Sequence, residues 1–231
     1  MNSSSEHKPR PMVDLVVSVI LPSLILMKFS GDDALGVTGG LVVALSLPLG
    51  WGIFELVKYK KFNFIALLGL VSVLLTGGIG LFELDNKWLA IKEAAVPALI
   101  GIAVFVSTFT PYPLVRALLL NSSIMDTELI KQKLEENNST ELFEKKLMTA
   151  TYFVVGSFAF SATMNYLLAK WIVVSPAGTE AFNEELGEMT LYSYPVIAIP
   201  SMIIMMGIFF YLLRTIRKAT GLTLEELMVK K

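Results

Sequence analysis

The chain has 231 residues, of which 54% are hydrophobic and 17% are charged, and its mean hydropathy is +0.65. This balance excludes an ordinary water-soluble domain, because one core of this size could not bury so many apolar side chains. The formal net charge of -1, without a long basic run, gives no basis for nucleic-acid binding. Cysteine is absent and the single histidine, His7, lies in a polar tail, which excludes disulfides, thiolate chemistry and paired-imidazole metal sites. We therefore expect no cofactor, no metal and no enzymatic activity.

The apolar residues gather in blocks of about 18 to 25, the length with which a helix crosses about 30 Å of hydrocarbon. We therefore predict an all-α fold, a polytopic bundle of about six transmembrane helices in a single domain, 12–218. A polar tail precedes it at 1–11, and a second tail follows at 219–231. The expected spans cover residues 12–29, 34–54, 62–81, 90–110, 147–174 and 191–213.

The distribution of lysine and arginine predicts which loops face the cytoplasm. The N-terminal tail, the second loop, the fourth loop at 111–146 and the C-terminal tail are basic. The first loop is acidic and the third is mixed, so the two sets alternate as six crossings require. The fifth loop is expected to be acidic and to lie on the outer side, and it carries Glu180, Glu184, Glu185 and Glu188. Both termini are therefore expected on the cytoplasmic side.

The fourth loop, 111–146, has the periodicity of two short amphipathic helices in the cytoplasm. Ser123 and Asp126 have the spacing of a capping box at the start of the first helix. The polar run at 137–139 predicts the end of that helix. A second short helix, with Leu142 and Phe143 on its apolar face, is expected before the fifth span.

Small residues recur every four positions in the second and third expected spans. They are Gly36, Gly40 and Ala44 in the second, and Ser72, Thr76 and Gly80 in the third. Such spacing lets a neighbouring helix approach closely, which matters in lipid because no hydrophobic effect acts between helices there. The pattern fits packing inside the bundle, which is the more general use, and it also fits a homodimer.

Two charged residues, Lys92 and Glu93, follow Trp88 by about one turn, at the outer end of the fourth span. A charge at the bilayer centre costs roughly 2.5 to 3.5 kcal/mol on insertion scales, so such residues usually pair or line a wet cavity. In one interpretation they form a polar vestibule for an ion or a small solute. The partners to test are then Glu83, Asp85 and Lys170. In the other interpretation both side chains lie at the interface and extend to water.

A polar stripe runs along the fifth span, where Ser157, Ser161 and Asn165 are four residues apart. Such a stripe is expected to face the inside of the bundle. The Asn165 amide needs hydrogen-bond partners in lipid, and a neighbouring helix could supply them. Holding helices together is the first hypothesis for this stripe, and contact with a solute is the second.

The middle of the chain resembles the intracellular septation protein A family over about residues 55–175. The resemblance is carried by 58–64, by 76–81, by 88–93 with Lys92 and Glu93, by 113–116, and by Asn165, Tyr166 and Trp171. Uncharacterised bacterial inner-membrane relatives of that family are more similar still, and they share 21–24 and 175–185. The resemblance implies a bacterial inner-membrane protein in envelope maintenance or division. It implies no reaction and no functional residues, and this chain differs from shorter members by the acidic segment and an added span.

Two classes of function follow. The first is a membrane scaffold or accessory factor that binds other envelope proteins or a second copy of itself. The alternative is a transporter or channel subunit for a small solute or an ion, working as an oligomer, to which Lys92, Glu93, Asn165 and the proline-interrupted helices point. No zinc-protease helix motif and no nucleophile elbow is found in the sequence, so an enzyme is not expected.

Overall fold

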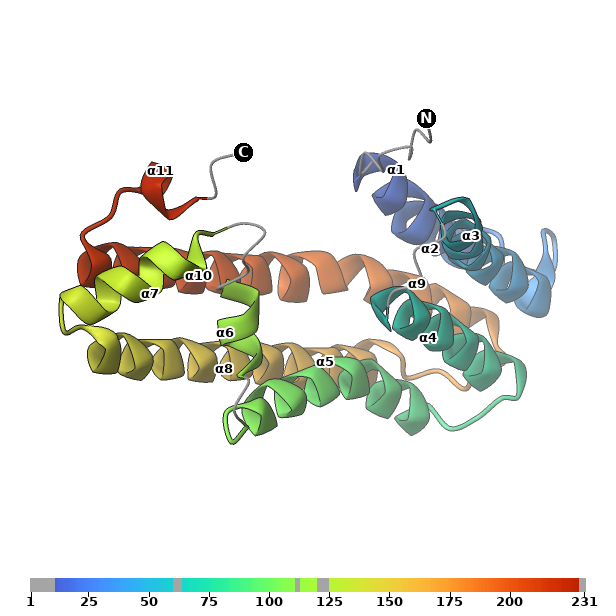
Figure 1. The fold of residues 1–231 in the computed structure, drawn as a ribbon. Coiled ribbons are helices and arrows are strands. Elements are labelled where there is room, and N and C mark those ends of the chain that lie inside the picture. The colour runs from blue at the N-terminus through green and yellow to red at the C-terminus, as the bar shows by residue number, and fades with distance from the viewer. Residues whose placement is uncertain (1–10, 60–63, 111–112, 120–124, 229–231) are drawn as a thin grey trace, which may run out of the picture. The chain divides into compact units, whose positions relative to one another are not determined.

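The computed structural model describes residues 11–59, 64–110, 113–119 and 125–228, and there the chain is helical without a β-strand (Figure 1). A single β-bridge in these ranges joins Met125 to Met228. Of the predicted features, the tail up to residue 10 and the capping residue Ser123 lie outside the described residues. The first helices are α1 Pro11–Leu15, the π-helix η1 Val16–Ile20, α2 Leu21–Lys28, α3 Gly36–Tyr59, α4 Phe64–Leu81 and α5 Lys87–Ser107. The others are α6 Leu114–Leu119, α7 Thr127–Glu136, α8 Thr140–Ile172, α9 Glu180–Ser193, the π-helix η2 Tyr194–Ala198, α10 Ile199–Thr220 and α11 Leu224–Leu227.

Four helical stretches of the described residues are long and apolar enough to cross a membrane. They are Gly36–Phe54, Lys87–Ser107, Thr140–Ile172 and Glu180–Thr220. The prediction of an all-helical membrane protein is confirmed to this extent. The expected first span coincides with helices from Pro11 to Lys28, and Val71–Leu81 of the expected third span forms a shorter apolar helix. The number of crossings stays a prediction.

Large apolar side chains remain exposed along the helices, which fits contact with lipid. In α10 these are Ile199, Met202, Ile203, Ile204, Met205, Met206, Phe209 and Phe210. In water such a row would be unfavourable, because burial of each large apolar side chain would stabilise the protein by about 1.5 to 3 kcal/mol. In hydrocarbon it is the expected surface of a helix.

The chain divides into two compact units, and each is assembled from two separate stretches of sequence. Unit 1 comprises Met1–Val96 and Thr163–Ala198, and unit 2 comprises Pro97–Ala162 and Ile199–Lys231. The boundaries fall inside α5, inside α8 and between η2 and α10. Each unit therefore depends on residues that are distant in the sequence.

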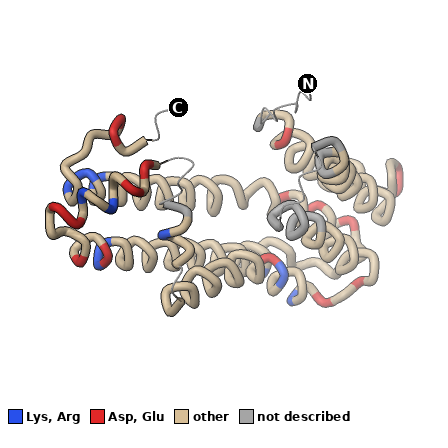
Figure 2. Tube along the Cα trace, viewed as in Figure 1, with Lys and Arg blue, Asp and Glu red and all other residues tan. Residues whose placement is uncertain are grey.

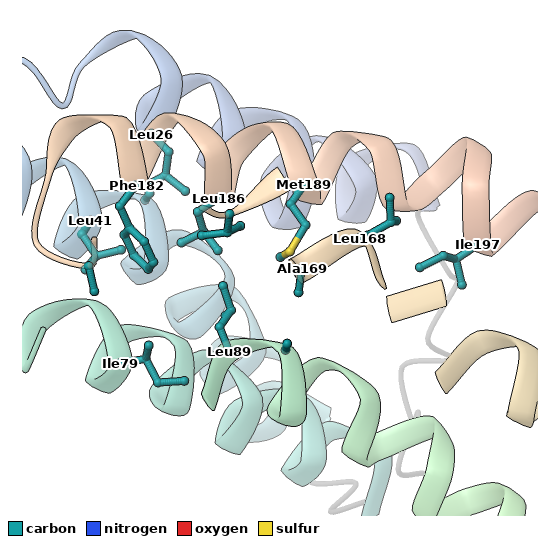
Figure 3. Close-up of a cluster of buried hydrophobic side chains, with 14 residues drawn as sticks. Leu26, Leu41, Ile79, Leu89, Leu168, Ala169, Phe182, Leu186, Met189 and Ile197 are labelled. Atoms are coloured by element: carbon teal, nitrogen blue, oxygen red, sulfur yellow. The ribbon is translucent and has the colours of Figure 1, made fainter. Parts of the chain in front are cut away.

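The core of unit 1 forms where α2 packs against α3 and α9, and α3 packs against α4. Helix α9 supplies Phe182, Leu186 and Met189, whose spacing puts them on one face (Figure 3). Phe182 and Leu41 of α3 lie together beside Ile79 of α4 in this view. Leu89 of α5 and Leu168 of α8 belong to the same cluster, so both sequence stretches of unit 1 contribute to one apolar centre.

Unit 2 has its own core, in which long faces of α8 and α10 contribute most of the buried side chains. These are Phe143, Leu147, Ala150 and Val154 from α8, and Ile208, Leu212, Ile216 and Ala219 from α10. Helix α7 packs against α10, and the Nδ2 of Asn137 donates to the carbonyl oxygen of Ala219 over 3.0 Å. Leu227 of the C-terminal segment is fully buried in the same core, and its carbonyl accepts from the backbone N–H of Asp126.

Charge is unevenly distributed over unit 2. Acidic and basic side chains gather on α7, at the beginning of α8 and at the end of α10, while the intervening stretches of α8 and α10 are uncharged (Figure 2). Among them, Arg116 of α6 forms an ion pair with Glu144 of α8. The beginning of α8 and the end of α10 therefore share a charged, water-compatible region.

Two expectations about helix boundaries are wrong. The acidic outer loop is a helix: α9 begins at Glu180, where the Oγ1 of Thr179 caps it by accepting from the N–H of Phe182. The glutamates alternate with buried apolar residues, and burial of that apolar face stabilises the helix. The second short cytoplasmic helix is not separate either, because α8 runs without a break from Thr140 through the expected fifth span.

The expected start of the first cytoplasmic helix also needs a correction. Asp126 is the N-cap of α7, since its Oδ1 accepts from the N–H of Leu129 over 3.0 Å. The predicted end is confirmed, because α7 stops at Glu136 and Asn138 takes a positive φ of 50° before α8 begins.

Candidate functional site

A cavity of about 220 Å³ lies within unit 1, between helices that are far apart in the sequence. Its polar lining consists of Ser18, Ser23, Ser72, Thr76, Lys92, Glu93, Asn165, Thr190 and Ser193. Its other lining residues are Pro22, Leu26, Leu45, Pro48, Val73, Leu168, Leu186 and Met189. Polar and apolar side chains thus share the wall of a small cavity, and small-molecule sites also combine the two kinds of surface.

The two charged residues of the cavity form an ion pair. The Nζ of Lys92 lies 2.5 Å from a carboxylate oxygen of Glu93, and the two side chains are 9% and 24% exposed. Lys92 also donates to the Oγ1 of Thr76 over 2.7 Å and to the Oγ of Ser72 over 3.3 Å. The Lys92 side chain is therefore largely buried against α4 and does not extend to the surface.

Ser23 of α2 is one of the residues that line this cavity, and its hydroxyl is buried. The residue is 1% exposed, and its Oγ has no hydrogen-bond partner among the described residues. Leaving a buried donor or acceptor unsatisfied costs about 1 to 3 kcal/mol. A group that enters the cavity could relieve this cost by bonding to Ser23.

Prolines interrupt the helices at the cavity wall. Pro22 has no N–H and cannot donate the α-helical bond to the carbonyl of Ser18, which also lines the cavity. The preceding turn is the π-helix η1, in which the N–H of Leu21 donates to the carbonyl of Val16. A second π-helix, η2, begins just after Ser193 and contains Pro195. Such π turns inside α-helices are frequent at functional sites.

The other members of the predicted vestibule have different neighbours. Asp85 pairs with Lys87 over 3.3 Å, and the Nζ of Lys170 lies 6.0 Å from the centre of the Tyr166 ring. Glu83 takes a positive φ of 50° in the turn after α4 and packs beside Gly178. None of the three lines the cavity. The turn between α4 and α5 directs Glu83 and Asp85 toward other groups, which residue spacing alone could not indicate.

The predicted polar stripe of α8 is divided between the two units. Asn165 belongs to unit 1 and lines the cavity. Ser161 belongs to unit 2, where its Oγ lies 2.9 Å from the Oγ of Ser201 in α10. Ser157 is buried in unit 2 as well. Ser161 thus links α8 to α10, and Asn165 is part of the cavity wall.

The predicted small-residue positions have several different roles in unit 1. A Cβ at Gly80 would meet Leu41 at 2.5 Å and Phe182 at 3.4 Å, and a Cβ at Gly40 would clash with Ser30, so both glycines permit close packing. Ala44 is fully buried. Ser72 and Thr76 line the cavity instead. Gly36 does not pack, since nothing lies within 4 Å of its Cβ position; its φ of +69° makes it a turn glycine.

Two further polar residues of unit 1 have structural roles that the sequence does not indicate. Asn183 of α9 is fully buried, and its Nδ2 donates to the Oγ of Ser30 over 3.0 Å and to the carbonyl of Val37 over 2.8 Å. The Glu185 carboxylate accepts from the backbone N–H groups of Val174 and Ser175 over 2.9 and 2.8 Å. Both residues lie in a segment expected to be a solvated loop, so only recognition of α9 could have revealed them.

Metal ligands are not brought together in the part of the chain that the structure describes, where no three His, Cys, Asp or Glu side chains could share an ion. The cavity itself offers hydrogen-bonding groups and the Lys92–Glu93 ion pair. Comparison of the chain with family models, curated proteins and solved structures finds no match.

Proposed function

We propose that this chain is a membrane transporter or channel subunit that admits a small polar solute to the cavity of unit 1. The observation that carries the proposal is the Lys92–Glu93 ion pair, buried against Thr76 at the cavity wall of an apolar protein. Ionisable residues at membrane depth are costly, and they typically mark a solute or ion pathway. Proline-interrupted helices around such a site are a common feature of transporters.

The proposed topology has six crossings with both termini in the cytoplasm of a bacterial inner membrane. The basic loops support this orientation. Unit 2 also supports it, because Phe143 near the start of α8 and Ile216 near the end of α10 share one core. The fourth loop and the C-terminal segment then lie on the same side of the membrane, as an even number of crossings after that loop requires.

A scaffold in the cell envelope is the second proposal, and the resemblance to the septation protein A family favours it. Such a scaffold needs only packing faces, which the exposed apolar helices provide. It gives no reason for an ion pair and a buried, unpartnered Ser23 hydroxyl beside a cavity. The cavity therefore favours the transport proposal.

Solute uptake by proteoliposomes that contain the purified chain tests the proposal. We expect uptake above that of protein-free vesicles, and a loss of at least about tenfold in Lys92→Met, which leaves Glu93 unpaired. Lys87→Met is the matched control: Lys87 begins the same helix, but its side chain is 61% exposed and pairs with Asp85 outside the cavity.

Equal uptake in Lys92→Met and in wild type would contradict the proposal. Size-exclusion chromatography in detergent shows whether each variant stays folded, so that loss of uptake can be separated from loss of protein. If no solute crosses and envelope proteins co-purify reproducibly, the scaffold is the better account.

A further inference from the structure

We infer that the cavity selects an uncharged solute rich in hydrogen-bonding groups, such as a small polyol or an amide, and that Ser23 is one of its contacts. This inference rests on the proposed function and names the class of solute. It starts from the charge of the cavity wall. Lys92 and Glu93 are its only ionisable members among the described residues, and they neutralise each other.

The ammonium group of Lys92 has no donor left for an anionic solute. An ammonium has three N–H groups. Here the Nζ contacts a Glu93 carboxylate oxygen, the Oγ1 of Thr76 and the Oγ of Ser72 over 2.5, 2.7 and 3.3 Å. An anion would have to break one of these contacts, and a cation would have to compete with Lys92 for Glu93. In an apolar protein either solute would bring an unbalanced charge, which is more costly to bury than an uncharged polar group.

The cavity does offer bonding capacity to an uncharged solute. The Ser23 hydroxyl is a donor and an acceptor without a partner in the described residues, and it is 1% exposed. The remaining polar wall is formed by groups without formal charge, among them Ser18, Asn165 and Thr190. Leu168 and Met189 provide apolar surface for a carbon chain. Hydroxyl and amide groups on a short carbon skeleton match this combination.

The volume limits the size of the solute. About 220 Å³ exceeds a cavity of about 150 Å³ that holds one benzene molecule. A compound of about six to ten non-hydrogen atoms is therefore of suitable size. Erythritol, a four-carbon polyol, is the uncharged probe. Threonate, its four-carbon anionic counterpart, and ethanolamine, a small cation at neutral pH, are the charged probes.

Uptake of the three labelled probes by proteoliposomes of the full chain, with an ionophore present to remove any membrane potential, tests the inference. We expect erythritol to enter faster than into protein-free vesicles, and threonate and ethanolamine to enter no faster. If a charged probe enters and erythritol does not, transport stands and the selectivity inference fails. If none of the three probes enters, both the proposed transport function and the selectivity inference are contradicted.

Ser23→Ala tests the contact itself. Loss of one uncharged hydrogen bond weakens binding by about three- to tenfold, and we expect erythritol uptake at low concentration to fall by that factor. The matched control is Ser46→Ala in α3, because Ser46 is exposed and its hydroxyl donates to the carbonyl of Val43 in its own helix.

Thermal unfolding in detergent distinguishes this contact from a structural role. Removing a buried hydroxyl without a partner leaves the melting temperature equal or higher, so reduced uptake in a stable Ser23→Ala protein supports the inference. Unchanged uptake in that protein would overturn it.

Discussion

Gly187 of α9 lies against the backbone of Ser23 in α2: a Cβ atom at position 187 would come within 2.8 Å of the Ser23 carbonyl oxygen. The same atom would lie 2.8 Å from the Cγ of Met27. A carbonyl within a helix cannot move aside as a flexible side chain can. The two helices therefore approach this closely because residue 187 has no side chain, and this contact holds the cavity wall at Ser23.

Gly187→Ala is expected to separate α2 from α9 and to destabilise the protein by about 1 to 3 kcal/mol, the usual cost of overpacking. Gly207→Ala in α10 is the control, since nothing lies within 4 Å of its Cβ position. There alanine improves helix propensity by up to about 1 kcal/mol. Thermal unfolding in the same detergent compares the two variants, and an equal response would contradict the assigned role of Gly187.

Replacing Asn183 with alanine should remove the polar link between α9 and the start of α3. It leaves the buried Ser30 hydroxyl without the Nδ2 donor, and an unsatisfied buried group costs about 1 to 3 kcal/mol. Glu184→Ala, at an exposed position of the same helix, controls for loss of a polar side chain from α9. Chemical denaturation in mixed micelles measures both. If Asn183→Ala destabilises the protein no more than Glu184→Ala does, Asn183 is not a stabilising link between α9 and α3.

Glu185→Ala is expected to loosen the connection between α8 and α9. The carboxylate accepts from the N–H groups of Val174 and Ser175 and from the Ser175 hydroxyl, over distances of 2.7 to 2.9 Å. Hydrogen bonds to a charged group contribute about 1.5 to 3 kcal/mol each. We expect faster amide hydrogen exchange at residues 174 and 175. Glu188→Ala is the matched change on the same helix, and it should leave exchange at both amides as in wild type.

Asp85 provides a prediction about pH. A hydrogen bond from the backbone N–H of Lys87, followed by one from its side chain, holds the pKa of this carboxyl below its ordinary value. A carboxyl with a lowered pKa in the folded state stabilises the fold above its unfolded pKa of about 3.9 and stops doing so as the pH falls through the folded value. Stability should therefore be level from neutral pH down to about 4 and decrease below it.

The matched variant is Lys87→Ala, which keeps the backbone donor and removes the ammonium. Because the backbone hydrogen bond is the larger cause, an NMR titration of the Asp85 carboxyl carbon should still give a pKa below the ordinary value in this variant. A return to the ordinary value would assign the effect to the Lys87 side chain instead.

The sequence predicts those features of the fold that depend on composition along a single helix. The apolar blocks locate the helices, and the polar run 137–139 locates the end of α7 because Asn138 can take a positive φ. It fails for α9, where four glutamates hide the spacing of Phe182, Leu186 and Met189. The apolar face of α9 stabilises the helix only when it is buried against α2 and α3. Such contacts between distant segments cannot be recognised from the sequence of α9 alone.

For the candidate site, the sequence identifies the charged and amide residues that are unfavourable in apolar helices, but not the residues that surround them. Lys92, Glu93 and Asn165 are conspicuous because charge and amide groups are rare in apolar helices, and the structure puts all three at one cavity. Serines in helices are ordinary, so Ser23 is conspicuous only in three dimensions. Its environment is created by Gly187, which is 164 positions away in the sequence.

The alternation of the two units along the chain constrains biosynthesis. Unit 1 is incomplete until residues 163–198 have been made, and unit 2 is incomplete until 199–231 follow. Unit 1 therefore cannot fold completely until residue 198 has been made, although larger chains usually fold each domain as it is synthesised. The helices made first remain in the bilayer without their later partners, and a translation product that stops before residue 198 would leave both units incomplete.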